Sequence, residues 1–488
     1  MDNIESASKI GDVQPSLLIR GAAGILTGGS GTTSRSQGHD IRIRNGVIVA
    51  IGDLPPEPRE QVFDASGCVV YPAWVNTHHH LAQSLLKGVP GGINSTLTPW
   101  LSAVPFRFRK CFDEQLLRTA ARIGLIELAL SGCGTVADHH YMYWPGMDFD
   151  GAQILFEEAE RLGMRFVLCR GGATQSRHFE KNTREVEQLS DYLDDVSRLK
   201  GEFHDPGPNA MRRVVVAPTT VMFSMDSGEL REVAEHARSL GLRLHSHLSE
   251  TVLYQEASRE KYHCTPIQLA EKTGWLGADV WYAHLVKLDR AEIELLGATH
   301  TGIAHCPQSN GRLASGIAPI RALQDAGVQI SLAVDGAGSN EAADMLHEAH
   351  VAWLMARARA GQGATPRYAG GRGEEGADSV TVEDVIHWGT AGGATVLGLH
   401  DVGTLAPGKA ADIAIYELDQ PRHFGVHDLS IAPVICDGAT VKTLLVAGKA
   451  VVEDRKIPGI DLVELAFEAR QAVDRLKYLA ERQASSSE

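Results

Sequence analysis

Strand-like and helix-like segments alternate through the middle of this chain, and this alternation limits its possible folds more than any other feature. Eight apolar segments are predicted to be strands, most of them separated by helical segments such as 113–131 and 151–162. Such an alternation is typical of a parallel sheet covered by helices, and eight repeats predict an α/β protein with a TIM-like (β/α)8 barrel. The eight segments span residues 68–80, 134–139, 165–170, 213–218, 242–247, 280–284, 302–306 and 328–335.

Both ends of the chain show a different pattern, rich in short strands and turns. Segments 40–44 and 47–51 flank Asn45-Gly46, a dipeptide typical of a hairpin turn. Segments 411–416 and 441–446 continue this style near the other end. We therefore predict a small β-sandwich domain formed from both chain ends. The predicted division is 15–70 for the first part of the sandwich, 71–402 for the barrel, 403–460 for the second part of the sandwich and 461–483 for a C-terminal helix.

The charge balance argues against a polyanionic partner. The chain has 46 Lys and Arg against 61 Asp and Glu, a formal net charge of -15. A surface of this sign repels nucleic acid and anionic lipid, so we expect a small-molecule substrate and neither nucleic acid nor membrane as a partner. The N-terminus lacks the pattern of a secretory signal, no apolar run is long enough to span a membrane, and the seven cysteines contain no CxxC pair. These features predict a cytoplasmic protein with reduced thiols.

Three consecutive histidines end the first predicted barrel strand. Side chains alternate along a strand, so His78 and His80 share one face and His79 points to the other. Further polar residues follow other strands at their carboxyl ends, where barrel active sites are built. Imidazole nitrogens and a carboxylate at one rim are suitable ligands for zinc or iron(II). The residues at these strand ends are His78, His80, His247, His284, His305 and Asp335.

Taken together, the motifs around these residues resemble the amidohydrolase superfamily. The chain contains an HxH opening motif, an HxHxxE motif and four later motifs in the order found in that superfamily, within residues 15 to 460. Within it, the chain is similar to the cytosine/guanine-deaminase branch, and especially to members that deaminate isoxanthopterin and 8-oxoguanine. The superfamily motifs are segments 76–80, 245–250, 283–285, 305–310, 334–336 and 403–412, and the branch resemblance lies in 79–85, 130–135 and 138–143.

The resemblance implies a single divalent metal ion. Binuclear members of the superfamily bridge two metals with a carboxylated lysine on the fourth strand, and segment 213–219 contains no lysine. Zinc is the expected ion, with iron(II) as the alternative. The implied ligands are His78, His80, His247 and Asp335, whereas His79 is expected to pack structurally.

The same resemblance implies hydrolytic deamination and a role for three residues. A bound metal lowers the pKa of water towards about 7, which makes the water a nucleophile near neutral pH. Asp335 is expected to accept a proton from that water, and Glu250 to protonate a ring nitrogen beside the carbon under attack. His284 is expected to orient the attacking oxygen by hydrogen bonding. The amine then leaves as ammonia.

Four further residues are predicted to contact the substrate. An oxidised bicyclic lactam needs polar partners for its carbonyl groups and its amidine edge, and Gln83 and Arg170 have suitable types and positions. Tyr141 offers a hydroxyl group and Trp100 a stacking face. Each has a structural alternative: a salt bridge for Arg170, a backbone cap for Gln83, and packing for the two aromatic residues.

The resemblance leaves several activities open. A pterin such as isoxanthopterin is the expected substrate. The alternatives are deamination of 8-oxoguanine or guanine, and removal of an amine or chloride from a triazine. From a different class, a catalytically silent amidohydrolase-like scaffold is disfavoured, because the four implied ligands and Glu250 are all present. The resemblance is also compatible with a homo-oligomer.

Overall fold

The computed structural model describes residues 16–176, 185–363 and 380–485. Its centre is a sheet of eight parallel strands in the order β14-β13-β12-β11-β10-β9-β8-β7. A parallel bridge between His79 and Asp335 joins the last strand segment to the first and brings the sheet round into a barrel. The strands are β7 (Trp74–His79), β8 (Cys133–His140), β9 (Arg165–Arg170), β10 (Arg212–Val216), β11 (Leu244–Leu248), β12 (Val280–His284), β13 (Gly302–His305) and β14 (Gln329–Leu332).

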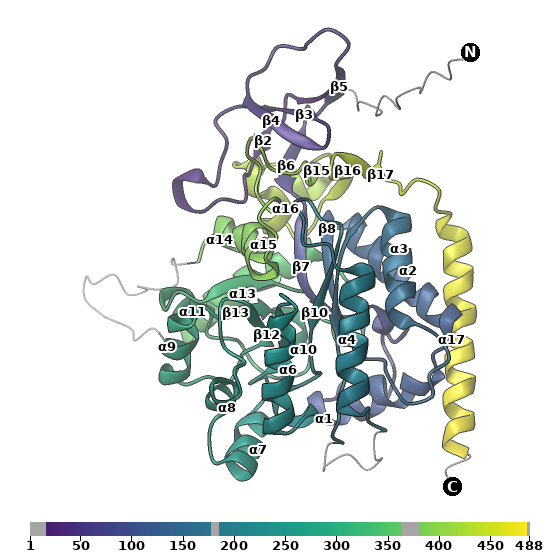
Figure 1. The fold of residues 1–488 in the computed structure, drawn as a ribbon. Helices are drawn as coiled ribbons and strands as arrows, with labels where there is room; N and C mark the ends of the chain where they lie inside the picture. The colour runs from purple at the N-terminus through teal and green to yellow at the C-terminus, as the bar shows by residue number, and fades with distance from the viewer. Residues whose placement is uncertain (1–15, 177–184, 364–379, 486–488) are drawn as a thin grey trace, which may run out of the picture.

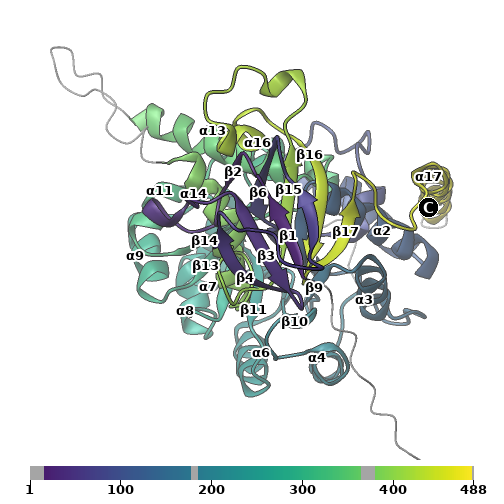
Figure 2. The same ribbon diagram turned by 90° about the horizontal axis from the view of Figure 1, so that it is seen from above.

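Helices surround the barrel, as the alternating pattern predicts (Figures 1 and 2). Many begin with a side-chain cap; Asp289, for example, accepts the backbone N–H of Glu292 and forms a capping box. The (β/α)8 prediction is therefore confirmed. The main helices between and after the strands are α2 (Glu114–Leu130), α3 (Gly151–Leu162), α4 (Leu189–Phe203), α6 (Ser227–Ser239), α7 (Val252–Tyr262), α8 (Pro266–Lys272), α9 (Arg290–Ala298), α11 (Ile320–Asp325) and α13 (Met345–Gly363).

Shorter helical segments connect these elements. They include α1 (Leu97–Leu101), α5 (Val221–Ser224), α10 (Pro307–Arg312), α12 (Ala337–Asn340), α14 (Val382–His387), α15 (Gly393–Leu397), α16 (Ala432–Ile435) and the single-turn segments η1 (Gly31–Thr33), η2 (Leu81–Leu85), η3 (Ser102–Phe106), η4 (Arg109–Cys111), η6 (Trp388–Gly392), η7 (Pro421–His423) and η8 (Leu429–Ile431). Two of them matter most for the site: η2 follows the three histidines and α12 follows Asp335.

The two chain ends together form a second β unit beside the barrel, as predicted. A five-stranded sheet, β17-β16-β15-β6-β2, combines strands from both ends, and a four-stranded sheet, β4-β3-β1-β5, comes from the N-terminal end alone. Figure 2 shows the purple N-terminal strands beside the yellow-green C-terminal ones. The strands are β1 (Leu17–Arg20), β2 (Gly24–Ile25), β3 (Asp40–Arg44), β4 (Val47–Gly52), β5 (Gln61–Asp64), β6 (Cys68–Pro72), β15 (Ile413–Glu417), β16 (Thr440–Val446) and β17 (Lys449–Glu453).

The single apolar run predicted as the opening barrel strand is divided between the two units. Its first half is β6, which pairs with β15 of the small unit, and its second half is β7, the first barrel strand. Ala73 lies between them and donates its N–H to the Asp412 carbonyl. The buried ion pair between Arg165 and Asp412, 3.1 Å apart, also joins the barrel to the small unit. The exact domain limits remain a prediction.

The predicted hairpin and C-terminal helix are both present. Asn45 and Gly46 have φ values of 50° and 76°, which a two-residue turn of this kind requires, and they connect β3 to β4. Helix α17 (Leu462–Ser485) lies against α2 (Figure 1) and buries the face that carries Leu465 and Leu476. Among the described residues, no helix combines the length and apolar character needed to cross a membrane.

Candidate metal centre and active site

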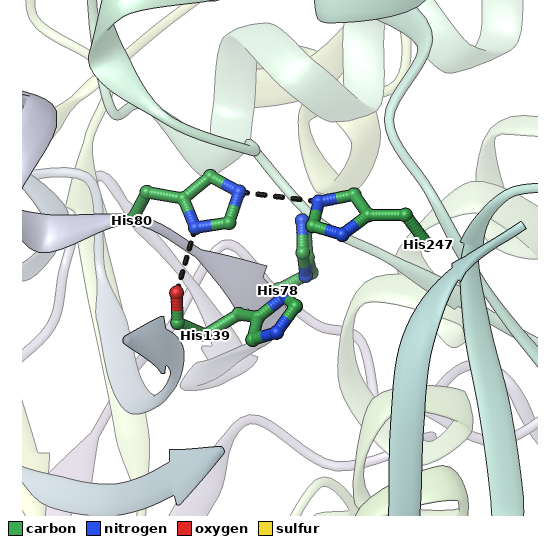
Figure 3. A group of neighbouring side chains, drawn as sticks. All are labelled: His78, His80, His139 and His247. Atoms are coloured by element: carbon green, nitrogen blue, oxygen red, sulfur yellow. Dashed lines mark hydrogen bonds between the residues drawn. The ribbon is translucent and has the colours of Figure 1, made fainter. Parts of the chain in front are cut away.

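Four side chains predicted as metal ligands meet at the carboxyl-end rim of the barrel. The Nε2 atoms of His80 and His247 lie 3.3 Å apart. Oδ1 of Asp335 lies 3.4 Å from Nε2 of His78 and 3.3 Å from Nε2 of His80. Figure 3 shows the imidazole rings of the three histidines converging, with His139 beside them. Strands β7 and β11 and the segment after β14 therefore bring these residues together from distant parts of the chain.

The hydrogen bonds of two rings determine which nitrogen faces the centre. Nδ1 of His80 lies 2.8 Å from the carbonyl oxygen of His139, and Nδ1 of His247 lies 2.6 Å from that of Thr219. A carbonyl oxygen only accepts, so both Nδ1 atoms carry the hydrogen and both Nε2 atoms present lone pairs. Two lone pairs facing each other with a carboxylate oxygen nearby repel one another. A cation between them removes that repulsion, so the residues fit a divalent metal ion.

Burial keeps the imidazoles of His78 and His247 in the form that binds a metal. His78 is fully buried, and its Nε2 has no hydrogen-bond partner among the described residues. Burial lowers the pKa of His78 to about 3 and holds the pKa of His247 well below its ordinary value. Both rings are therefore uncharged at neutral pH, which leaves their lone pairs available.

Asp335 is held firmly in place. Its φ of 60° lies in the left-handed region, which a non-glycine residue adopts only when its surroundings enforce it. Oδ1 accepts the N–H of Gly336 at 2.8 Å, and Oδ2 accepts the hydroxyl of Ser309 at 2.6 Å. His79, which was expected to pack structurally, hydrogen-bonds through Nδ1 to the carbonyl oxygen of Asp335. This histidine thus helps to hold the backbone of a predicted ligand.

The two other predicted catalytic residues lie next to each other. Nε2 of His284 is 3.7 Å from Oε2 of Glu250, and both side chains are buried. Ser315 donates its hydroxyl hydrogen to Oε1 of Glu250 at 3.0 Å. Nδ1 of His284 lies 2.9 Å from Oδ1 of Asn310. A second group of close ligand atoms, within 4.8 Å of one another, comprises His78, His284 and Asp335. Glu250 and the predicted ligands therefore belong to one site.

A cavity opens beside these residues and contains three of the four predicted substrate contacts. Gln83 donates from Nε2 to the Tyr141 hydroxyl at 2.9 Å and accepts the N–H of Gly338 at 3.2 Å. Trp100 donates from Nε1 to the Gly338 carbonyl at 2.9 Å. The cavity lining comprises His80, Gln83, Leu97, Trp100, Leu101, Phe106, Tyr141, Thr219, Thr220, His247, Glu250, Tyr254, His284, Leu313 and Asp335.

The fourth predicted contact, Arg170, lies outside this cavity lining. Its buried guanidinium group binds Glu187 at 2.6 Å and Asp195 at 2.9 Å, and it also donates to the Gly171 carbonyl. The guanidinium also packs on the Tyr143 ring, 3.8 Å from its centre. These partners use most of its donors, and Arg170 is not part of the cavity lining. This geometry favours the salt-bridge alternative, and a substrate contact of Arg170 stays an untested prediction.

Several residues around the site were not singled out from the sequence. His139 has a ligand atom within 4.8 Å of those of the three histidines, and its carbonyl positions His80. It ends the predicted strand 134–139 and is the last residue but one of β8, so the strand-end argument that selected the other histidines would also have selected this one. Ser309, Asn310 and Ser315 act through hydrogen bonds. Ser309 and Asn310 lie in motif segment 305–310, but no sequence pattern shows which side chain each of the three residues contacts.

The pattern that defines the amidohydrolase family matches residues 69–451. The chain belongs to the amidohydrolase family. It is 59% identical over 472 residues to an isoxanthopterin deaminase from an unknown prokaryotic organism, covering 95% of this chain and 98% of that one. It is 36% identical to the 8-oxoguanine deaminase of Pseudomonas aeruginosa, covering 88% of this chain and 92% of that one.

Solved structures of amidohydrolases share the fold. An amidohydrolase from an environmental sample of the Sargasso Sea is 52% identical, with a TM-score of 0.82 and coverage of 95% of this chain and 99% of that one. The zinc complex of atrazine chlorohydrolase TrzN from Arthrobacter aurescens TC1 is 28% identical, with a TM-score of 0.84 and coverage of 94% and 100%. The predictions of the superfamily and of a hydrolytic enzyme are confirmed, and the cluster of histidines and Asp335 fits the divalent metal that such enzymes use.

Proposed function

We propose that this enzyme is a metal-dependent deaminase that hydrolyses an oxidised pterin, isoxanthopterin or a close analogue, to the corresponding carbonyl compound and ammonia. The observation that carries the proposal is the 59% identity to an isoxanthopterin deaminase over almost the whole of both chains. The arrangement of Glu250, His284 and Asp335 around one cavity supports the reaction class. 8-Oxoguanine is the second candidate substrate, since the 8-oxoguanine deaminase is more distant at 36% identity.

The proposed ligands of the metal are His78, His80, His247 and Asp335. Zinc is the proposed ion, because it accepts this mixture of imidazole nitrogen and carboxylate oxygen and because the related triazine hydrolase was solved with zinc. When bound, a divalent ion of this kind lowers the pKa of a water molecule towards about 7 and so supplies a nucleophile at neutral pH.

The three catalytic residues then handle the protons of the reaction. Asp335 accepts a proton from the attacking water, and Glu250 gives a proton to the ring nitrogen beside the carbon that is attacked. The water oxygen forms a bond to that carbon, the proton held by Asp335 passes to the amine, and the bond from carbon to the amine breaks to release ammonia. The hydrogen of the added hydroxyl returns to Glu250 as the carbonyl forms. One water is consumed and one ammonia is released, so atoms and charge balance.

His284 is proposed to hold the oxygen that adds to the ring. Its Nδ1 faces the amide oxygen of Asn310, which accepts, so Nδ1 carries a hydrogen. Nε2 of the neutral ring therefore accepts a hydrogen bond from the attacking water and so orients its oxygen. Oε2 of Glu250 lies 3.7 Å from this nitrogen, on the same side of the cavity lining.

Gln83, Tyr141 and Trp100 are proposed to recognise the ring. After its bonds to Tyr141 and Gly338, the Gln83 amide keeps one N–H and one oxygen lone pair. These two groups match the carbonyl and N–H of a lactam edge. The Trp100 ring, whose orientation is set by its bond to the Gly338 carbonyl, offers a stacking face.

The proposal includes a cytoplasmic location with neither nucleic acid nor membrane as a partner. All seven cysteines are free, which suits a reducing compartment, and the net charge of -15 disfavours polyanionic surfaces.

The test is ammonia release by zinc-loaded protein with isoxanthopterin, pterin, 8-oxoguanine, guanine, cytosine and a triazine. We expect selective turnover of isoxanthopterin that is lost in Glu250→Gln. Turnover of 8-oxoguanine alone would support the proposed mechanism but show that 8-oxoguanine, and not isoxanthopterin, is the substrate. Absence of ammonia with every compound, in protein that holds its zinc, would refute the proposed deamination.

A further inference from the structure

His245 has no part in the reaction described above, although it lies in the motif that supplies His247 and Glu250. It is on β11 and is completely buried. Its ring stacks on that of Trp281, with centroids 4.5 Å apart and planes 18° apart. Nδ1 lies 2.9 Å from the carbonyl oxygen of Trp281, and Nε2 lies 2.7 Å from Nδ1 of His78.

The Trp281 carbonyl determines the direction of both hydrogen bonds. The Trp281 carbonyl only accepts, so His245 carries its hydrogen on Nδ1. Nε2 of a neutral His245 is then an acceptor, and the hydrogen of the second bond must be on Nδ1 of His78. His78 is therefore left with a bare Nε2, the atom that lies 3.4 Å from Oδ1 of Asp335.

His78 differs in this respect from the two other proposed histidine ligands. Nδ1 of His80 and Nδ1 of His247 both bond to backbone carbonyl groups, those of His139 and Thr219. Backbone carbonyls are present whatever the side chain, whereas the partner of His78 is itself a side chain. A single substitution at residue 245 can therefore remove the hydrogen-bond partner of His78 Nδ1, whereas the partners of the other two rings belong to the backbone.

We propose that His245 is a positioning residue that holds His78 as the Nδ1–H tautomer and thereby keeps its Nε2 ready for the metal. This inference rests on the proposed metal site and not on the identity of the substrate. Without an acceptor at residue 245, the buried N–H of His78 loses its partner. The ring then gains by moving its hydrogen to Nε2, where it can donate to Asp335, and this tautomer cannot bind the ion.

The test compares two substitutions by zinc affinity. His245→Leu fills much of the space but offers no acceptor, whereas His245→Gln offers an amide oxygen. Zinc dissociation constants are measured on metal-free protein by competition with a chromogenic chelator, with no substrate present. Loss of an outer hydrogen-bond partner typically weakens metal binding about 10- to 100-fold, and we expect this for His245→Leu. His245→Gln should recover most of the affinity.

The matched control is His305→Gln, which changes another buried strand-end histidine, and it should leave zinc affinity unchanged. Thermal unfolding of each metal-free variant confirms that the fold is retained. A folded His245→Leu protein that binds zinc as tightly as the unsubstituted protein would overturn the proposal. Equal weakening by Leu and Gln would also overturn it, because stacking on Trp281 would then be the relevant property.

A second measurement needs no variant at residue 245. Nitrogen NMR of ¹⁵N-histidine-labelled metal-free protein distinguishes a protonated from a bare ring nitrogen, and the His78 signals are assigned with a His78→Gln variant. We expect a protonated Nδ1 and a bare Nε2. The opposite tautomer would refute the proposal. Neither measurement depends on deamination, so a failure of the proposed function and a failure of this inference are separable.

Discussion

Ser315 donates its hydroxyl hydrogen to Oε1 of Glu250 over 3.0 Å, and this bond leaves Oε2 of the same carboxyl group facing Nε2 of His284. The two oxygens of Glu250 therefore have different surroundings. One is held by a side chain that has no part in the chemistry, and the other faces His284. This arrangement orients the group that we propose as the proton donor.

Replacing that group should abolish turnover without affecting the metal. Glu250→Gln keeps the shape but removes the exchangeable proton, so kcat should fall by about 10²- to 10⁴-fold, the usual contribution of general acid catalysis. Zinc content, measured by atomic absorption, should stay unchanged. Ser315→Ala is the matched control and should lower kcat much less. A Glu250→Gln enzyme of undiminished kcat would exclude this residue as the acid.

Removal of the metal should destabilise the folded enzyme. The facing lone pairs of His80 and His247, 3.3 Å apart, repel each other unless a cation lies between them. Zinc at 100 times its dissociation constant should add about 2.7 kcal/mol to the free energy of unfolding. Differential scanning calorimetry of chelator-treated protein, with and without added zinc, measures this. Asp335→Asn should reduce the gain, and an equal gain in that variant would argue against Asp335 as a ligand.

Gly336 is predicted to be essential for the position of Gln83. A Cβ atom at residue 336 would lie 2.1 Å from Oε1 of Gln83, although the backbone of Gly336 itself suits any residue. Gly336→Ala should therefore displace the Gln83 amide and raise KM about tenfold, roughly the cost of one lost polar contact. Gln83→Leu should raise KM similarly. Steady-state kinetics on the preferred substrate decides, and unchanged KM in both variants would remove Gln83 from substrate recognition.

Arg170 should matter for stability rather than for binding. Its side chain is 3% exposed and pairs with Glu187 and Asp195. Arg170→Leu removes this partner from Glu187 and leaves Asp195 with Arg198, which should lower the free energy of unfolding by about 3–5 kcal/mol. Urea unfolding measures this loss, and KM of the remaining folded enzyme should stay unchanged. A specific increase in KM with full stability would support the substrate-contact prediction.

His305 should make the metal-free protein sensitive to acid. Burial lowers the pKa of His305 from 6.5 to about 3. Between these two values the unfolded chain binds a proton that the folded protein does not, so stability falls as pH falls. This residue contributes about 1.4 kcal/mol per pH unit in that window. Urea unfolding at pH 6.5, 5.5 and 4.5 should show a smaller slope for His305→Gln, and an unchanged slope would contradict the neutral buried state.

The sequence by itself determined the barrel, the small β unit from both ends and the rim that carries the histidines. These features depend on local periodicity and on strand ends, which are readable along the chain. The superfamily motifs added the set of predicted ligands and Glu250. The salt bridges of Arg170 could not be predicted in the same way, because a strand-end arginine has the same appearance in sequence whether its partners are a substrate or two carboxylates.

Only the tertiary structure decided which partner each polar group has. His78 hydrogen-bonds to His245, which is 167 residues away in the sequence. Thr77 and Ser331 form a hydrogen bond although 254 residues separate them. Three other contacts also join residues that are distant in sequence. Ser315 hydrogen-bonds to Glu250, His79 hydrogen-bonds to the Asp335 carbonyl, and Gly336 leaves space for Gln83. Hydrogen bonds and close packing depend on positions to within a fraction of an ångström. Periodicity in a sequence specifies which face a side chain occupies, but only the closed barrel specifies which atoms lie opposite it.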